Sequence, residues 1–354
     1  MDDSPIARRK NEHVALALGQ GAGFQSTRTL LDQVQLIHDP LPELSLEQVD
    51  TSVQLFGRSL RFPLVIAAMT GGSSQTGEIN KQLASIAQER GYGFGLGSQR
   101  AMLAAPSLAD SYRVRDVAPD VLLLGNIGVN QARDLPTTAV RKLVDEVGAD
   151  AMCVHMNPAQ EVVQPEGDHD FRGAIGTFAR LVQELGCPVI AKETGCGVSL
   201  SAARRLRAAG VMHIDVSGAG GTSWVAIEAM RAQGTQQQVG ELLREWGIPT
   251  AASLAMVRKA RVETIIATGG ISTGLDIARA IALGASVAGI ARPVLQALSR
   301  DGRGGAVALL EAIEAQLRAT MLLVGASNLR QLASTPRIIG PDLERWMASG
   351  PAEF

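Results

Sequence analysis

The chain has 354 residues, of which 46% are hydrophobic, 19% charged and 3% aromatic, and its formal net charge is −2. Without an excess of Lys and Arg, a nucleic-acid backbone is a poor partner, and no apolar run reaches the length of about 18 residues that would insert into a membrane. The polar residues 1–12 do not resemble a secretory signal, and the three cysteines lack metal-ligand spacing, so we expect a cytoplasmic protein.

Eight short apolar runs follow one another along the chain, and each is followed by a segment with helical spacing. Runs of this kind, rich in Val and Ile, are typical of strands buried on both faces of a parallel sheet. The predicted strands are 63–69, 92–97, 121–126, 151–157, 188–192, 213–217, 263–268 and 286–291. Helical signals, each closed by a glycine, occupy 76–90, 177–185, 199–209 and 272–283. This alternation favours a single (β/α)₈ TIM barrel over an open sheet or two domains.

Three further segments complete the predicted organisation. Residues 249–254 resemble a ninth strand, but we interpret them as a loop that leads into a helix over 254–260 with Ser253 as its cap. We expect an N-terminal arm over 1–60, the barrel over 61–305, and a C-terminal helix (306–323) and tail over 306–354 that pack on the barrel. The basic segment 8–13 is either a solvated terminus or a mobile arm that supplies cations to an anionic ligand.

The active site of such a barrel forms at the carboxyl ends of its strands. Glycines at the ends of the last three predicted strands favour a phosphate site there: they lie in loops at 218–222 and 269–270, and near the end of the last strand at 289. Lys192 ends an otherwise apolar strand. It is either a structural residue, a positive charge beside a flavin, or a Schiff-base lysine. Asn126 and Ser98 are placed to hydrogen-bond the edge of a ring.

The end of the fourth predicted strand carries the densest group of polar residues. His155 is either a buried core residue or a functional one. No His or Cys pair has zinc spacing, whereas one carboxylate with few other ligands is typical of Mg²⁺ bound to substrate phosphate. We favour Glu161 over Glu166 as that carboxylate, and we interpret Glu166 and Asp168 as part of a turn.

Taken together, these residues resemble the type 2, flavin-dependent isopentenyl-diphosphate isomerases over nearly the whole chain. The motifs that carry the resemblance are Arg9-Lys10-x-x-His13, Met69-Thr70-Gly71-Gly72, Ser98-Gln99-Arg100, His155-x-Asn157-x-x-Gln160-Glu161, Pro165-Glu166-Gly167-Asp168, Lys192-Glu193-x-Gly195, Gly218-Ala219-Gly220-Gly221-Thr222-Ser223-Trp224 and Gly269-Gly270-Ile271. Gly125 stands where the pattern favours Ala, which affects packing only.

The resemblance implies interconversion of isopentenyl diphosphate and dimethylallyl diphosphate in isoprenoid biosynthesis, with reduced FMN as acid and base, Mg²⁺ on the diphosphate and NADPH as reductant. It implies catalytic roles for Gln160, His155 and Asn157, and Mg²⁺ binding by Glu161. The implied substrate residues are Arg9, Lys10, His13, Ser98, Gln99, Arg100 and Gln160. The implied FMN residues are Ala68, Met69, Thr70, Gly71, Ser98, Asn126, Lys192, Ser217, Thr222, Gly269, Gly270, Ala291 and Arg292.

The family also tends toward tetramers and octamers, so we expect a homo-oligomer. Arg9, Lys10 and His13 would close over the diphosphate as a lid, and Trp224 either walls the pocket or belongs to the core. Two alternatives remain: an FMN-dependent oxidoreductase of the 2-hydroxy-acid oxidase type, and a non-catalytic sensor of a phosphorylated ligand.

Overall fold

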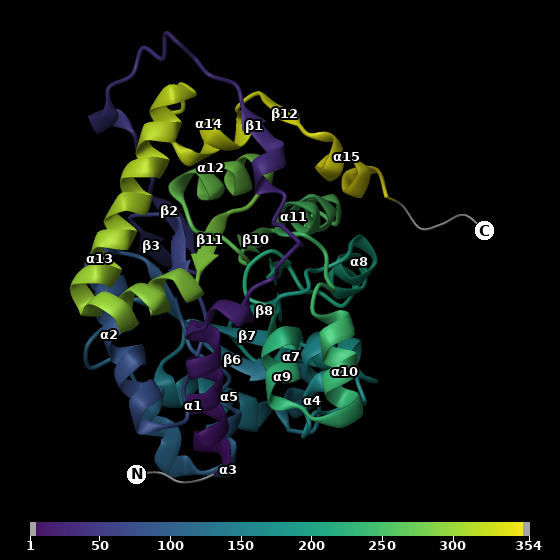
Figure 1. The fold of residues 1–354 in the computed structure, drawn as a ribbon. Coiled ribbons are helices and arrows are strands. Elements are labelled where there is room, and N and C mark those ends of the chain that lie inside the picture. The colour runs from purple at the N-terminus through teal and green to yellow at the C-terminus, as the bar shows by residue number, and fades with distance from the viewer. Residues whose placement is uncertain (1–4, 350–354) are drawn as a thin grey trace.

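A computed structural model describes residues 5–349, and its centre is a closed barrel of eight parallel strands (Figure 1). The barrel confirms the predicted fold, and each strand lies within or overlaps the run predicted for it. The last strand pairs with the first through Val65 and Gly289, which closes the ring. The strands are β4 (Leu64–Ile66), β5 (Gly93–Gly95), β6 (Leu122–Gly128), β7 (Ala151–Met156), β8 (Val189–Glu193), β9 (His213–Asp215), β10 (Thr264–Ala267) and β11 (Val287–Ile290).

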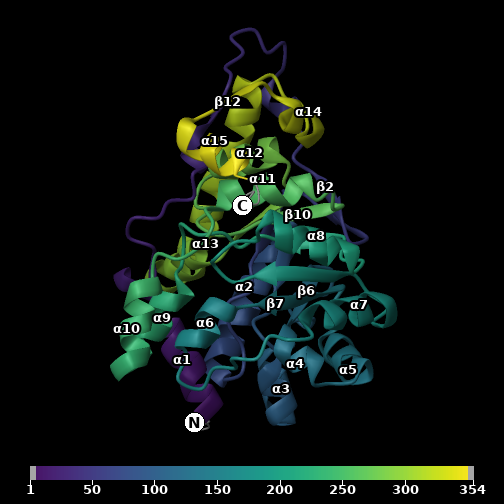
Figure 2. The ribbon, with the colours of Figure 1, turned by 90° about the vertical axis from the view of Figure 1, so that its right-hand side faces the viewer.

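Helices surround the barrel on its outside (Figures 1 and 2). Ser73, Ser199 and Thr273 cap three of them by accepting a backbone N–H. The helices that follow strands or loops of the barrel are α2 (Ser74–Arg90), α3 (Arg100–Ala104), α4 (Val129–Arg133), α5 (Thr137–Val147), α6 (Pro158–Val163), α7 (Ala174–Glu184), α8 (Leu200–Ala208), α9 (Trp224–Arg231), α10 (Gly234–Leu243), α11 (Thr250–Lys259) and α12 (Gly274–Leu283). Short 3₁₀ turns are η1 (Gln20–Ala22), η2 (Leu31–Gln33), η3 (Leu46–Gln48) and η4 (Pro106–Ser111).

Helix α11 begins earlier than predicted, at Thr250, so the loop assigned to 249–254 is wrong. Ser253 lies inside the helix, and its hydroxyl accepts the backbone N–H of Val198 at 2.7 Å and donates to the Val198 carbonyl at 3.0 Å. The apolar residues of this segment are therefore buried in a helix that packs on the barrel.

The C-terminal part is more ordered than predicted. Helix α13 (Arg292–Leu323) starts directly after the last strand and is kinked at Gly302, whose φ of 65° is a left-handed conformation. The expected tail forms α14 (Leu329–Ser334), β12 (Arg337–Ile339) and α15 (Pro341–Ala348). Strand β12 pairs antiparallel with β1 (Val34–Leu36), so the N-terminal extension and the C-terminal tail meet.

The two ends of the barrel differ. A hairpin of β2 (Val53–Leu55) and β3 (Arg58–Leu60) covers the amino ends of the strands, where Leu55 and Leu60 join one buried cluster with barrel residues such as Leu122. At the other end, helix α1 (Pro5–Leu18) lies beside α2, α9 and α13 (Figures 1 and 2). The closed end leaves the carboxyl ends of the strands as the place for a site.

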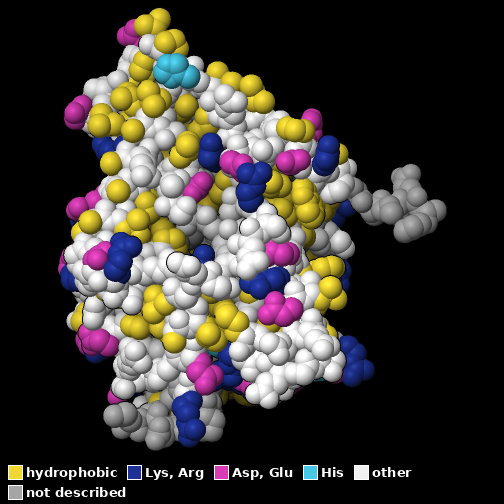
Figure 3. All heavy atoms as spheres, in the orientation of Figure 1, with side chains coloured by type: hydrophobic (Ala, Val, Ile, Leu, Met, Phe, Trp, Pro, Cys, Tyr) yellow, Lys and Arg dark blue, Asp and Glu magenta, His cyan; other side chains and the backbone are white. Residues whose placement is uncertain are grey.

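The outer surface is mixed in charge. Figure 3 shows Lys and Arg interspersed with Asp and Glu over the face drawn, in keeping with the net charge of −2. Within residues 5–349, every helix is too short or too polar to cross a bilayer.

Candidate active site at the carboxyl ends of the strands

A cavity of about 410 Å³ opens at the carboxyl ends of the strands, and residues at or just after the end of each of the eight strands line it. Its size is within the range of small-molecule sites. Most residues singled out from the sequence lie in its wall: Arg9, Lys10, His13, Ala68, Met69, Thr70, Ser98, Arg100, Asn126, His155, Asn157, Gln160, Glu161, Lys192, Ser217, Thr222, Gly269, Gly270, Ala291 and Arg292. Trp224 also lines the cavity, with its ring edge-on to that of His13 at 5.4 Å.

Two of the predicted site residues, Gln99 and Gly71, lie outside the cavity lining. Gln99 is fully buried; its side chain donates to the Leu143 carbonyl at 2.9 Å and accepts the Asn126 N–H at 2.9 Å. It therefore supports Asn126 from behind, and its side chain does not reach the cavity. Gly71 packs on Tyr112, where a Cβ would lie 2.2 Å from the ring. The absence of a side chain at Gly71 thus allows a close backbone approach to Tyr112.

Lys192 is held on the cavity floor by an acidic partner. Its Nζ lies 2.8 Å from Oδ2 of Asp215, and the two side chains are 9% and 5% exposed. Asp215 also accepts the Thr268 hydroxyl and, at 3.2 Å, the Ser217 N–H. The amine therefore faces the cavity as a cation fixed by a buried carboxylate that the sequence reasoning missed.

His155 is a neutral imidazole. Burial lowers the pKa of His155 to about 3, and the charges of Lys10, Lys192 and Arg100 act in the same direction. Its Nδ1 lies 2.8 Å from Oδ1 of Asn126, whose amide nitrogen donates to the Leu96 carbonyl at 3.1 Å. Nδ1 therefore carries the proton, and Nε2 is left as an acceptor.

Close backbone packing shapes one side of the cavity. A Cβ on Gly221 would lie 2.3 Å from the nitrogen of Gly270, and one on Gly269 would lie 2.1 Å from the Gly218 carbonyl oxygen. Next to these glycines, α13 begins at Arg292 without a side-chain cap. The start of a long helix, with glycine loops around it, is a typical anion site.

Three cations in the lining have no hydrogen bond or ion pair with any residue of the described range 5–349: Lys10, Arg100 and Arg292. Arg9, by contrast, contacts Glu166 at 3.2 Å. Burial lowers the pKa of Lys10 to about 8, and the neighbouring charges of Arg9 and Arg100 add to this. Cations without acidic partners in one cavity favour an anionic ligand.

Glu228 on α9 is fully buried and connects three elements, although the sequence reasoning did not select it. Its Oε1 accepts the Gln160 amide at 2.9 Å and lies 3.0 Å from Nε2 of His13, while Oε2 lies 2.6 Å from Arg231. Burial raises the pKa of Glu228, but the contacts with His13, Gln160 and Arg231 outweigh it, and the net pKa is lowered. Glu228 therefore acts as a carboxylate that orients the Gln160 amide.

Glu161 is a buried carboxylate with both oxygens oriented. Oε1 accepts the Asn157 amide at 2.9 Å and Oε2 accepts the Asp168 N–H at 2.8 Å. Between residues 5 and 349 no group of three or more His, Cys, Asp or Glu side chains is arranged to hold a metal. Glu161 thus fits a divalent cation only if a ligand supplies further oxygens, which is the manner in which Mg²⁺ binds phosphates.

Comparison with known proteins identifies the relatives of this chain. The profile of the FMN-dependent dehydrogenase family matches residues 4–156 and 130–339. An isopentenyl-diphosphate delta-isomerase of Aeropyrum pernix is 43% identical over 94% of this chain and 89% of its own length. A protein with the same description from Halobacterium salinarum is 41% identical, covering 96% of this chain and 95% of the relative.

Solved structures share the fold. A lactate oxidase of Pediococcus acidilactici, described as putative, superposes with a TM-score of 0.68 at 17% identity, covering 94% of this chain and 93% of its own. A mandelate oxidase variant gives 0.65 at 19% identity over 95% and 100%. At these identities the likeness shows the barrel fold alone.

Proposed function

The chain belongs to the FMN-dependent dehydrogenase family and, within it, to the isopentenyl-diphosphate delta-isomerases, and from this premise we propose that it interconverts isopentenyl and dimethylallyl diphosphate with reduced FMN and Mg²⁺. The observation that carries the substrate is the pair of unpartnered cations, Lys10 and Arg100, in the same cavity as the buried carboxylate Glu161. A diphosphate with a divalent cation satisfies both kinds of group at once.

The cavity lining fits FMN. Thr70 lines the cavity and is 2% exposed, and its Oγ1 has no partner among the residues that the structure describes, so it offers a hydrogen bond to a ligand. The rim of Gly269, Gly270 and the start of α13 would hold the phosphate, with Arg292 as its counterion. Met69, Ser98 and Asn126 would lie along the ring, and Lys192 would place its charge beside it.

The residues of this chain would divide the work on the substrate. Lys10 and Arg100 would bind the diphosphate, and Glu161 would hold Mg²⁺ against it. Gln160, fixed by Glu228, would orient the hydrocarbon part, whereas the neutral His155 would act as a hydrogen-bond partner. Helix α1, with Arg9 and His13 in the lining, would cover the substrate and exclude water.

When bound, reduced FMN would supply the acid and base for moving a proton between carbons of an unactivated alkene, which few protein side chains can protonate. We further propose NADPH as reductant, a cytoplasmic location, a homo-oligomer, and a division into the arm 1–60, the barrel 61–305 and the C-terminal part 306–354. The 2-hydroxy-acid oxidase alternative now rests on the fold alone.

The test is anaerobic incubation of the protein with FMN, NADPH, Mg²⁺ and isopentenyl diphosphate in D₂O. We expect dimethylallyl diphosphate that carries deuterium, with many turnovers after a single reduction of FMN. Consumption of NADPH in proportion to product, or of O₂ in a parallel aerobic assay, would instead indicate an oxidoreductase. A protein that binds no FMN would favour the sensor.

A further inference from the structure

The loop between α6 and α7, residues 164–173, has no helix or strand, but it reaches the active site at three residues: Gln164 lines the cavity, Glu166 contacts Arg9, and Asp168 contacts Glu161. The backbone N–H of Asp168 donates to Oε2 of Glu161 at 2.8 Å. The loop also passes closely over α6, since a Cβ on Gly167 would lie 1.9 Å from the Glu161 carbonyl oxygen. The loop backbone therefore helps to set the orientation of the Glu161 carboxylate, together with Asn157.

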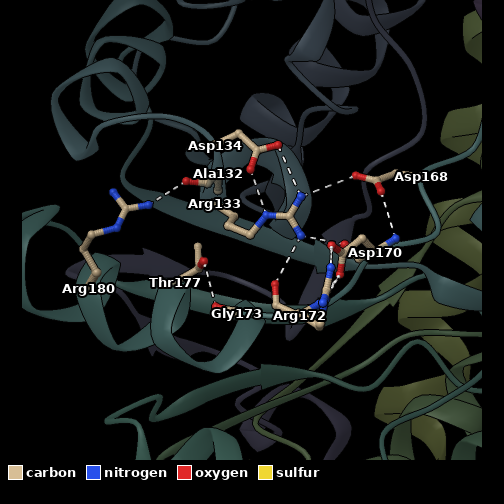
Figure 4. A network of polar contacts seen from close by, with 9 residues as sticks. All are labelled: Ala132, Arg133, Asp134, Asp168, Asp170, Arg172, Gly173, Thr177 and Arg180. Carbon is tan, nitrogen blue, oxygen red and sulfur yellow. Dashed lines mark hydrogen bonds and ion pairs between the residues drawn. The ribbon is translucent and has the colours of Figure 1, made fainter.

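Arg133, at the end of α4, attaches this loop to the barrel (Figure 4). Its NH1 donates to the Asp170 carbonyl at 2.6 Å and to the Arg172 carbonyl at 3.2 Å. Its NH2 lies 3.8 Å from the Asp168 carboxylate, and its Nε donates to Asp134 at 2.8 Å. The Arg133 guanidinium thus contacts three residues of the loop and the carboxylate of its sequence neighbour Asp134.

The loop's own side chains make these contacts rigid. Oδ1 of Asp168 accepts the Asp170 N–H at 3.0 Å, and Oδ1 of Asp170 accepts the Arg172 N–H at 3.0 Å. These two turns connect the carbonyls that Arg133 holds with the N–H that Glu161 accepts. A displacement at Asp170 would therefore reach the Asp168 N–H directly.

We propose that Arg133 is a positioning residue for Glu161: it fixes the loop 164–173 so that the Asp168 N–H holds the carboxylate in the orientation that receives the divalent cation. The inference rests on the proposed function, because Glu161 is the proposed Mg²⁺ ligand. Displacement of the loop would leave Asn157 as the remaining partner of the carboxylate, on Oε1 only. Partners that orient a metal ligand typically contribute about 10- to 100-fold to metal affinity.

The test measures metal binding apart from turnover. FMN-loaded protein is titrated with Mn²⁺ in the presence of inorganic pyrophosphate, and free Mn²⁺ is followed by EPR. We expect Arg133→Met to weaken Mn²⁺ binding about 10-fold or more, and Arg133→Lys to lie between, because an ammonium cannot reproduce the fork of a guanidinium. The FMN dissociation constant should stay unchanged in both variants.

Arg141→Met is the matched control. Arg141 also joins an acid on its own helix (Asp145) to the backbone carbonyl of another segment (Leu185, at 2.5 Å), but it is placed away from Glu161. The Mn²⁺ affinity of the Arg141→Met variant should equal that of the unaltered protein. An equal weakening in this control would show a general effect of lost stability and would overturn the proposal.

The outcomes separate this inference from the function on which it rests. If the unaltered protein binds no Mn²⁺, or if Glu161→Gln binds Mn²⁺ as the unaltered protein does, the proposed metal site is wrong. If Glu161→Gln abolishes binding while Arg133→Met and Arg133→Lys bind as the unaltered protein does, Arg133 does not position the carboxylate. Should Arg133→Met fail to fold, Arg133→Lys alone decides in the same way.

Discussion

Replacing Lys192 by methionine tests whether this lysine serves the fold, the cofactor, or both. The change keeps most of the side-chain volume but removes the charge that faces Asp215 across 2.8 Å in a site where both side chains are nearly buried. Two consequences follow, one for the protein without FMN and one for FMN binding, and a second variant separates them.

The first consequence is a loss of stability. Breaking a buried ion pair by removing one partner costs about 3–5 kcal/mol, because the other charge stays buried. Asp215 keeps the Thr268 hydroxyl and the Ser217 N–H, so we expect a loss near the lower end, about 3 kcal/mol. The additional change Asp215→Asn removes the uncompensated charge and should recover most of that loss.

The second consequence is weaker FMN binding, which the additional change should not repair. A hydrogen bond to a charged group contributes about 1.5–3 kcal/mol, so loss of the amine should raise the FMN dissociation constant about 10- to 100-fold. The same rise is expected in Lys192→Met and in Lys192→Met/Asp215→Asn, since both lack the cation beside the ring.

The assays are urea unfolding of the FMN-free proteins and titration of flavin fluorescence. Recovered stability with FMN binding still weak in the double variant would confirm both roles. A double variant that binds FMN as tightly as the unaltered protein would refute the cofactor role. A Lys192→Met protein as stable as the original would refute the reasoning about the pair.

Three further changes address the substrate, the metal and the glycine rim. The pKa of Lys10 is lowered to about 8, so Lys10 is a cation below that pH and neutral above it. The KM for the diphosphate, measured from initial rates, should therefore rise as the pH passes through 8. Lys10→Arg should remove this rise. Glu161→Gln should abolish the dependence of activity on Mg²⁺ while the protein keeps its yellow colour; a normal Mg²⁺ titration would contradict the assignment. In Gly221→Ala the new Cβ would lie 2.3 Å from the Gly270 nitrogen, so FMN affinity and thermal stability should both fall, whereas Gly304→Ala, with no atom within 4 Å of its Cβ, should leave both unchanged.

The strands were predictable from the sequence because a strand buried on both faces must be short and apolar, and eight such runs alternate with helical segments. The start of α11 was not. Ser253 looked like a cap because serine before an apolar run usually is one, but it bonds Val198, 55 residues away. A contact at that distance leaves no local signal.

The site residues, too, were predictable from the sequence only in part. Position after a strand identified most of the lining, but it could not tell a side chain that enters the cavity from one that turns under the sheet, as Gln99 does. Asp215 left a signal, since a charged residue within an otherwise apolar strand needs a buried partner. Glu228 left none, because an acid on a helix usually faces water.

The hydrogen-bond and ion-pair partners of the charged side chains at the cavity indicate the kind of ligand better than the net charge of the chain does. The acids at the cavity, Asp215, Glu161 and Glu228, each have hydrogen-bond partners, whereas three cations of its lining lack any partner within residues 5–349. A surface of mixed sign and a net charge of −2 hide this local excess. Under the proposed function, Lys10 and Arg100 would bind one anion and Arg292 another, so the cavity would hold two phosphorylated molecules at once, which a sensor of a single ligand would not need.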